Sequence, residues 1–390
     1  MVDVRAAAVC DGSTEVCMSM AVDTEHDDTP PTWRASLPFM LAMGFPAVGL
    51  LVAAQPASAW VYALPLTIFG ALPLIDLVAG RSRVTLTPAA SARLARDWHF
   101  DVWLWLWVPL QLVAVVATLW QVGHVSLPPL QLAAIALSLG LLSGLGINVA
   151  HELMHRIGRV ERALAEVLMT MALYTHFCVE HVLGHHKHVS TPQDPASSRL
   201  GESVYAYLPR TLIGGLRSAW RIETARVARV KVAGSWRDRR VRYAVGQVAA
   251  VVVAGLLGGG IGVAVFVAQA IVAMLLLETI NFIEHYGLVR REVRPGVYER
   301  CLPEHSWNAS ERVTNWVLFH LQRHADHHHV ASRPFFALRH VDDSPQMPTG
   351  YAGMILLALV PPLWRTVMDH RVHAWRARES TQLTDETAAG

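Results

Sequence analysis

The sequence gathers nine histidines at spacings that suit metal binding. They form three clusters and one single site: His151 and His155 in "HELMH"; His181, His185 and His186 in "HVLGHH"; His324, His327 and His328 in "HADHH"; and His285 in "NFIEHYG". Residues three or four apart share one face of a helix, so each cluster can direct its imidazoles to a common point. Without a metal, such rings would repel one another on protonation and leave buried nitrogens unpaired. The pattern therefore predicts a metal centre.

The number of histidines indicates two metal ions. A catalytic zinc uses three protein ligands and an open position, which would leave six of the nine without a role. The "HELMH" stretch also fits the zinc-protease pattern HExxH, in which Glu152 would be the general base, and this alternative stays open. Two ions with four or five ligands each would use all nine, and imidazole-rich sites suit iron, copper, zinc or nickel.

Other residues limit the kind of site. The four cysteines include no CxxC pair, which argues against a cysteine-rich zinc site or a built-in iron–sulfur or rubredoxin module. Nothing marks Cys178 or Cys301 as a haem ligand. Four acids adjoin proposed ligands and are candidates to orient them, with ordinary solvated charges as the alternative: Glu152, Glu180, Glu284 and Asp326.

The elements that must position these histidines are membrane spans. Of the 390 residues 53% are apolar and only 16% charged, whereas a soluble domain has about 25% charged residues. Apolar runs of spanning length occur at about 37–54, 58–78, 103–121, 127–149, 243–258 and 260–281. Buried helices of a soluble protein are disfavoured, because runs such as "LPPLQLAAIALSLGLLSGLGINVA" have no polar face. The expected fold is an all-α polytopic membrane protein with six transmembrane helices and a histidine-rich cap.

Basic residues predict the orientation. None of the 33 Lys and Arg residues lies in the connections at 55–57, 122–126 or the glycine turn near 259. Because Lys and Arg are held on the cytoplasmic side, both termini and all nine histidines are expected there. The predicted organisation is a flexible leader (1–35), a membrane domain (36–375) with histidine-bearing regions at 150–242 and 282–375, and a polar tail (376–390). No signal peptide is expected.

A metal transporter is the alternative outside enzymes. Transporters carry ionisable groups near the middle of the bilayer. Here the spans contain only Asp76 and Glu278, both close to the predicted cytoplasmic end. Histidines at the mouth of an apolar bundle instead suggest chemistry on a lipid-soluble substrate. The net charge of +2 gives no reason to expect a nucleic-acid partner.

The motifs resemble those of the integral-membrane alkane 1-monooxygenase family, in the membrane fatty acid desaturase and hydroxylase superfamily. The matching stretches are "HELMH", "EHVLGHHKHVSTPQDPASSRLGES", "NFIEHYGL", "SWN" and "LFHLQRHADHH", in the family order, across roughly residues 37 to 370. Desaturases usually show HxxHH in the second box, whereas this chain has HxxxHH. Ala309 and Ala325 stand where the family often has serine.

The resemblance implies a non-haem di-iron site that uses O2 to hydroxylate the terminal carbon of a medium- or long-chain n-alkane. Its two iron ions would be held by the nine histidines named above, which we call the cage, and His188 would lie outside it. Electrons would come from a separate rubredoxin-type carrier with its reductase, and the enzyme would lie in the cytoplasmic (inner) membrane. A xylene-type methyl-group monooxygenase and a fatty acyl desaturase or hydroxylase are the alternatives within oxidation.

The resemblance also points to Ile68 as a size gate in a substrate channel. Ile68 lies eight residues from Asp76 in the second span, which is roughly 12 Å deeper in the bilayer. The family often has a bulkier aromatic residue there, so isoleucine predicts tolerance of longer alkanes. The alternative is that Ile68 merely faces lipid or a neighbouring helix.

Overall fold

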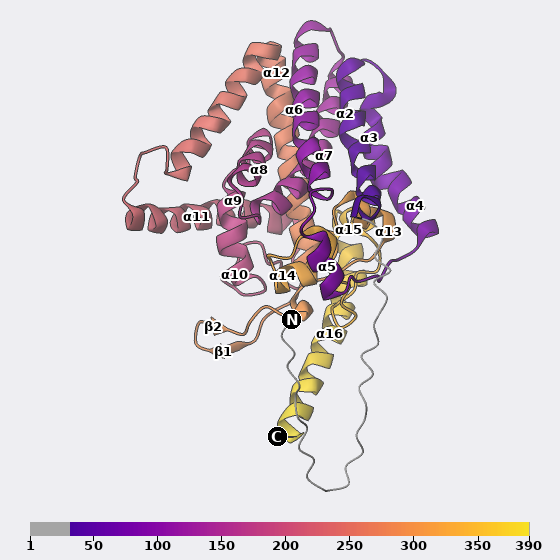
Figure 1. The fold of residues 1–390 in the computed structure, drawn as a ribbon, viewed down its shortest axis with the longest axis vertical. Coiled ribbons are helices and arrows are strands. Elements are labelled where there is room, and N and C mark those ends of the chain that lie inside the picture. The colour runs from indigo at the N-terminus through magenta and orange to yellow at the C-terminus, as the bar shows by residue number, and fades with distance from the viewer. Residues whose placement is uncertain (1–31, 390) are drawn as a thin grey trace, which may run out of the picture.

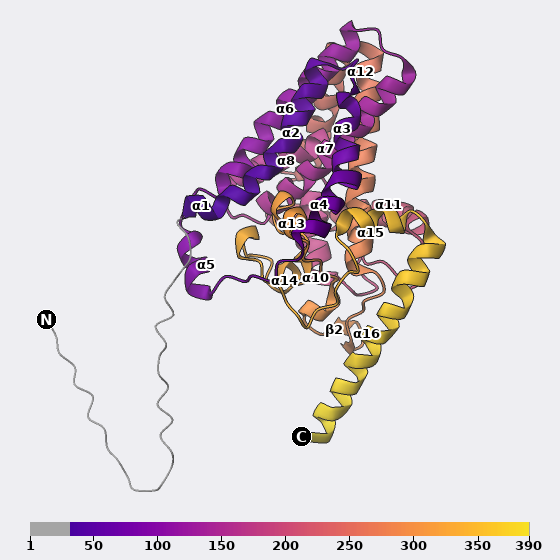
Figure 2. The same cartoon turned by 90° about the vertical axis from the view of Figure 1, so that its right-hand side faces the viewer.

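The computed structural model describes residues 32 to 389, and these form an all-α protein, as predicted (Figure 1). Long helices make a bundle, and a compact region of short helices and loops packs against one end of it (Figure 2). Residues 1–31 of the predicted leader and Gly390 of the predicted tail lie outside the described part of the chain. The leader's last residues begin helix α1, and the tail begins within helix α16.

Within residues 32–389, five helical segments are each long and apolar enough to cross a membrane. The first, Trp33–Ala54, joins α1 (Thr32–Ser36), η1 (Leu37–Met43) and α2 (Gly44–Ala54). The second, Ala59–Ala79, joins η2 (Ala59–Tyr62), α3 (Ala63–Leu66), the π-helix η3 (Thr67–Ala71) and α4 (Leu72–Ala79). The others are α6 (Asp101–His124), α7 (Pro129–Met154) and α12 (Arg239–His285).

Helix α12 contains the two last predicted spans. Gly259 interrupts it with φ 60° and ψ −153°, a backbone conformation that glycine adopts without steric cost. The two halves fold back on each other there (Figure 1), and a Cβ atom on Gly262 would lie 2.6 Å from the carbonyl oxygen of Ala254. Glycine therefore permits both the turn and the close packing. Six membrane crossings and their orientation stay predictions.

Helix α7 is the centre of the bundle, because 83% of its most apolar window is buried. Small residues let its neighbours approach closely. A Cβ atom on Gly140 would lie 2.4 Å from a side-chain atom of Val272 in α12, and one on Gly146 would lie 2.0 Å from Gln111 in α6. This packing fixes the end of α7, where His151 lies.

Short elements form the region at the histidine end. Before α12 these are α5 (Pro88–Leu94), α8 (Arg159–Met171), α9 (Phe177–Glu180), the π-helix η4 (His181–His185), α10 (His186–His188) and α11 (Val204–Val230). After it come the antiparallel strands β1 (Glu292–Arg294) and β2 (Val297–Tyr298), then η5 (Pro303–His305), α13 (Arg312–Val317), α14 (His324–His329) and η6 (Phe335–Ala337). Helices α15 (Tyr351–Ala358) and α16 (Pro361–Ala389) follow, bent by 120°.

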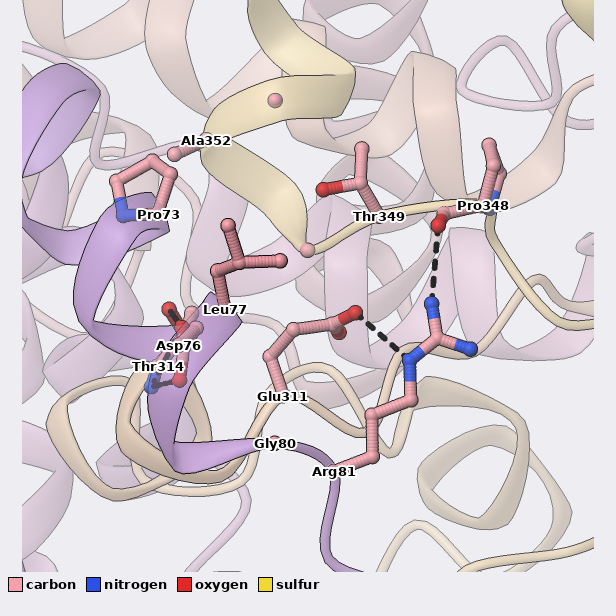
Figure 3. Close-up of a pocket in the computed structure, with 12 residues that line it drawn as sticks. Pro73, Asp76, Leu77, Gly80, Arg81, Glu311, Thr314, Pro348, Thr349 and Ala352 are labelled. Atoms are coloured by element: carbon pink, nitrogen blue, oxygen red, sulfur yellow. Dashed lines mark hydrogen bonds and ion pairs between the residues drawn. The ribbon is translucent and has the colours of Figure 1, made fainter.

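Asp76, at the end of the second segment, ties the bundle to this region (Figure 3). Its carboxylate accepts hydrogen bonds from Val313 N at 2.7 Å, Thr314 N at 3.2 Å and the Thr314 hydroxyl. These groups open helix α13, whose own N-cap residue, Glu311, makes no side-chain cap. Arg81 adds an ion pair to Glu311 at 3.1 Å. Asp76 therefore has a structural role that a transport pathway does not require.

Replacing Asp76 by alanine should lower the free energy of unfolding by about 2 kcal/mol, because α13 loses its cap and two N–H groups lose their acceptor. Denaturant unfolding of the purified protein in detergent measures the change. Leu77→Ala is the matched control, since the Leu77 side chain is 81% exposed. Equal stability of the two variants would show that the Asp76 cap on α13 contributes little to the free energy of unfolding.

Candidate metal centre

The structure brings all nine predicted histidines together in two groups. The five-histidine group holds His151, His155, His181, His186 and His327, and the four-histidine group holds His185, His285, His324 and His328. Within each group the candidate ligand atoms lie within 4.8 Å of one another. The rings of His186 and His328 stack with centroids 4.4 Å apart, so the two groups are adjacent.

Helical geometry distributes the histidines between the groups. A π-helix closes i→i+5 hydrogen bonds, so its turn is wider than that of an α-helix. Through η4, His181 therefore joins His186, five residues on, while His185 turns to the other group. In α14, His324 and His328 keep the α-helical spacing and share a group, and His327 belongs to the other. Both elements thus supply ligands to both groups.

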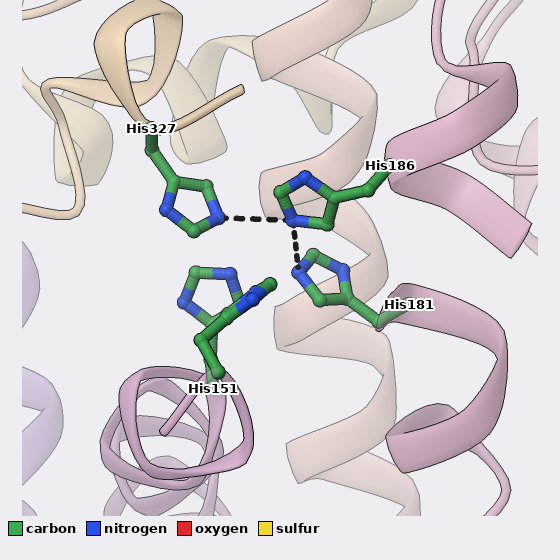
Figure 4. Close-up of side chains that lie close together, drawn as sticks. His151, His181, His186 and His327 are labelled. Carbon is green, nitrogen blue, oxygen red and sulfur yellow. Dashed lines mark hydrogen bonds between the residues drawn. The ribbon is translucent and has the colours of Figure 1, made fainter. Parts of the chain in front are cut away.

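The ring nitrogens lie at distances that suit a shared ion. His186 Nε2 is 3.0 Å from His181 Nε2 and 3.1 Å from His327 Nε2 (Figure 4). In the other group, His324 Nε2 is 3.2 Å from His285 Nε2 and 2.9 Å from His328 Nε2. Two nitrogens bound at right angles to one ion, each at about 2.1 Å, would be about 3.0 Å apart.

Several of these nitrogens have no partner within the described chain. His151 Nε2, His155 Nε2 and His185 Nε2 are buried and make no hydrogen bond there. Buried polar atoms are nearly always paired, so these three point to a missing ligand. Burial lowers the pKa of His155 to about 4 and holds the pKa values of five other rings outside the spans well below the usual range: His181, His186, His324, His327 and His328. His185 is the exception, because the effect of burial is outweighed by the Asp194 carboxylate, which raises the pKa of this ring to about 9. Neutral imidazole is the form that binds metal, so the residues present fit a metal ion at each group.

Among the four predicted acids, Glu284 contacts a histidine of the cage. Its Oε2 lies 3.2 Å from His324 Nε2, and the Tyr351 hydroxyl donates to its Oε1 at 2.5 Å. The other three have different surroundings. Glu152 pairs with Arg156 at 2.7 Å, Asp326 pairs with Arg333 and Arg339, and Glu180 keeps one buried oxygen without a partner among the described residues.

Asp194 is the acid that sequence reasoning missed. Its Oδ2 lies 2.9 Å from His185 Nδ1, and the two side chains are 0% and 1% exposed. Ser197 Oγ donates to the same carboxylate at 2.6 Å and Ala196 N at 3.0 Å. A carboxylate on Nδ1 fixes the tautomer and leaves Nε2 free for a metal. The signal was present in the "PQDPASSR" stretch, nine residues beyond His185, but not beside it in sequence.

The "SWN" motif positions the last histidine cluster. Asn308 Oδ1 accepts a hydrogen bond from Ala325 N at 2.9 Å, in the first turn of α14. Trp307 Nε1 donates to Tyr286 O at 2.9 Å, beside His285. Ala309 and Ala325, which stand where the family often has serine, are both buried, and their backbone N–H groups donate hydrogen bonds. The motif thus joins the end of α12 to α14.

Two further predicted residues lie outside the cage. His188 is half-buried and belongs to neither histidine group. Ile68 lies in the π-helix η3 with 7% of its surface exposed, in the apolar core of the bundle. Its burial excludes the lipid-facing alternative, and a lining role in a substrate channel stays a prediction.

Comparison with known proteins places the chain among membrane oxygenases. The fatty acid desaturase family model matches residues 126–358. Alkane 1-monooxygenase 1 of Pseudomonas aeruginosa is 43% identical over 85% of this chain and 88% of its own length. The alkane 1-monooxygenase of Acinetobacter baylyi is 40% identical over 79% of this chain and 76% of its own. The hydroxylase component of a xylene/toluene monooxygenase from Pseudomonas putida is 30% identical over 84% of this chain and 87% of its own. The chain therefore belongs to the fatty acid desaturase family and, within it, to the alkane 1-monooxygenases.

Proposed function

We propose that this protein is a non-haem di-iron monooxygenase that hydroxylates the terminal carbon of medium- or long-chain n-alkanes. The observation that carries the proposal is the pair of adjacent, buried histidine groups at the end of an apolar helical bundle. Relatives named alkane 1-monooxygenase support the substrate class. The nine histidines would hold two iron ions, whose chemistry when bound is the activation of O2.

The chain's own residues would prepare the site in three ways. Asp194 holds His185 with Nε2 directed to the cage, and Glu284 adds negative charge beside His324. Neutral imidazoles leave most of the ions' charge uncompensated, so this carboxylate favours metal binding. The apolar bundle offers an alkane chain the environment in which it is most stable, and its packing excludes water.

Observations favour this function over its alternatives. A zinc protease would need Glu152 as a free base, but that carboxylate is paired with Arg156. A transporter would need ionisable groups free to bind its cargo, but Asp76 caps α13 and Glu278 accepts hydrogen bonds from Tyr174 and Thr211, each at 2.8 Å. The xylene-type relative is 30% identical and the first alkane 1-monooxygenase 43%, which favours alkanes over alkylaromatics.

A separate electron carrier completes the proposal. We infer a rubredoxin-type donor with its own reductase, because the chain has no cysteine pair that could hold such a centre. The Lys and Arg distribution supports an inner-membrane protein with the histidines and both termini on the cytoplasmic side. The donor would then dock on a basic face.

Purified protein should contain close to two iron atoms per chain by elemental analysis, because the two histidine groups are separate. His181→Ala and His324→Ala each remove a ligand from one group and should lower the iron content and abolish turnover. His188→Ala is the matched control and should keep both. One zinc and no iron would contradict the monooxygenase proposal and favour a hydrolase.

Turnover under donor-limiting conditions should fall as salt rises, if an acidic carrier is steered to the basic face. Screening shortens the Debye length from about 10 Å at 0.1 M salt to about 3 Å at 1 M, which slows the association of opposite charges. The measurement is the steady-state rate at low donor concentration across this range, with saturating donor as control. A flat profile would argue against electrostatic docking.

Ile68→Trp should reduce hydroxylation of hexadecane while sparing octane, since only the longer chain would reach the indole. Product formation from the two alkanes measures the effect. Leu66→Trp adds the same ring to a side chain that is 68% exposed, and it should change neither activity. Equal loss on both alkanes in Ile68→Trp, or no loss on either, would show that Ile68 does not line the channel.

A further inference from the structure

A large cavity lies beside the five-histidine group and has no part in the function proposed above. Its volume is about 630 Å³, within the range typical of ligand sites. It lies between the end of α7, the start of α8, the π-helix η4 and the start of α12, and His155 forms part of its wall.

Basic side chains are numerous in the lining of this cavity. Five arginines line it: Arg156, Arg159, Arg162, Arg239 and Arg242. Three of them are paired with carboxylates, at 2.7 Å from Arg156 to Glu152, 3.7 Å from Arg239 to Glu223 and 2.5 Å from Arg242 to Glu166.

Arg159 and Arg162 differ from the other three. Neither lies within ion-pair distance of a carboxylate in the described chain, and Arg162 bonds only the carbonyl oxygen of Gly158, at 3.2 Å. Two guanidinium groups without a counter-charge, facing a cavity, favour an anionic ligand. A phosphate group suits them, because the guanidinium group of arginine can donate two parallel hydrogen bonds to the oxygens of one phosphate.

Apolar side chains also line the cavity. They belong to Met154, Ile157, Ala163, Val182 and Leu183. Ile157 is 93% exposed and Leu183 45% exposed, which is unfavourable in water for side chains of this size. A free inorganic anion gains nothing from such a wall, whereas an acyl chain does. The cavity is therefore amphipathic.

The position of the cavity corresponds to a membrane surface. Met154 is the last residue of α7 and Arg239 the first of α12, and both helices are of membrane-spanning length. Basic pockets between membrane helices at this level bind anionic headgroups. An acidic protein could contact the arginine rim, but its surface would leave the apolar wall uncovered. The basic and the apolar lining residues together favour a lipid.

We propose that this cavity binds one anionic phospholipid, with its phosphate between Arg159 and Arg162 and an acyl chain along the wall from Met154 to Leu183. The bound lipid covers His155 and separates the five-histidine group from water on this side. The proposal is independent of the reaction proposed above, because binding needs neither iron nor turnover.

Lipid retention by the purified full-length protein tests this site. The protein in detergent is incubated with phosphatidylglycerol or phosphatidylcholine and washed, and the retained lipid is extracted and counted by mass spectrometry. We expect one phosphatidylglycerol per chain and no retained phosphatidylcholine. Replacing both free arginines, in Arg159→Gln/Arg162→Gln, should weaken phosphatidylglycerol binding roughly thirty-fold, from the usual contribution of two basic residues at a membrane surface.

Two further variants separate the effects of arginine charge, cavity shape and misfolding on lipid retention. Arg217→Gln/Arg221→Gln removes the same charge from exposed positions on α11, outside the cavity, and should retain the lipid. Ala163→Trp fills the cavity from an exposed position and keeps all five arginines, so it should lose the lipid while its helical circular dichroism stays unchanged. Loss in both cavity variants and retention in the α11 control would support the proposal.

Three results would overturn it. Equal retention by the wild type and both cavity variants would place the lipid elsewhere. Displacement of phosphatidylglycerol by millimolar inorganic phosphate would mark a simple anion site. Loss of binding to an acidic electron carrier in Arg159→Gln/Arg162→Gln, with lipid retention unchanged, would make the arginine rim a protein-docking surface.

Discussion

The structure depends on one constraint: nine imidazoles must lie within a few ångströms of one another, with several buried nitrogens that have no partner in the described part of the chain. Each unpaired buried nitrogen destabilises the folded state, and a hydrogen bond or a bound metal would offset this cost. Protonation offers no relief for rings such as His181, His186 and His324, because burial holds their pKa values well below the usual range. A protein can keep such a cluster only if rigid elements on all sides hold it open for an ion.

The backbone around the cluster accepts strain to meet this constraint. Ser190, just beyond α10, has φ 58°, and Phe319 and His320, just before α14, have φ 51° and 56°. Residues other than glycine rarely adopt these values, and such strain gathers where function requires a fixed geometry. The π-turn of η4 is a second departure from regular structure, and it directs His181 and His185 to different histidine groups. Irregular backbone therefore lies next to the ligand-bearing helices α10 and α14, and in η4 it divides the ligands between the two groups.

The sequence predicted which nine histidines come together, but not how they divide into two groups. Histidine type and spacing identified all nine residues that converge, and apolar length identified the helices that carry them. The division into two groups could not be predicted from the sequence. The i, i+4 spacing of an α-helix places His181 with His185, whereas the wider turn of η4 places His181 with His186. The acids follow a related rule, because neighbours in sequence point apart on a helix: Glu284 contacts His324, which is distant in sequence, and not the adjacent His285. Asp194 reaches His185 from the following loop, and only tertiary structure shows this contact.

The carboxylates of the spans explain how helices in a mobile bilayer can support a fixed arrangement of the nine histidines. Asp76 ends the second span and caps α13, and Glu278 in α12 receives the hydroxyls of Tyr174 and Thr211 from segments outside the bundle. A buried carboxylate is costly unless it is fully hydrogen-bonded, so each of these contacts selects one position of the cap relative to the spans. Helix α7 enters the centre directly at His151, and α12 does so at His285. The two apolar helices most involved in the core thus become ligand-bearing at their ends, which places the reactive site where the apolar interior meets the polar cap.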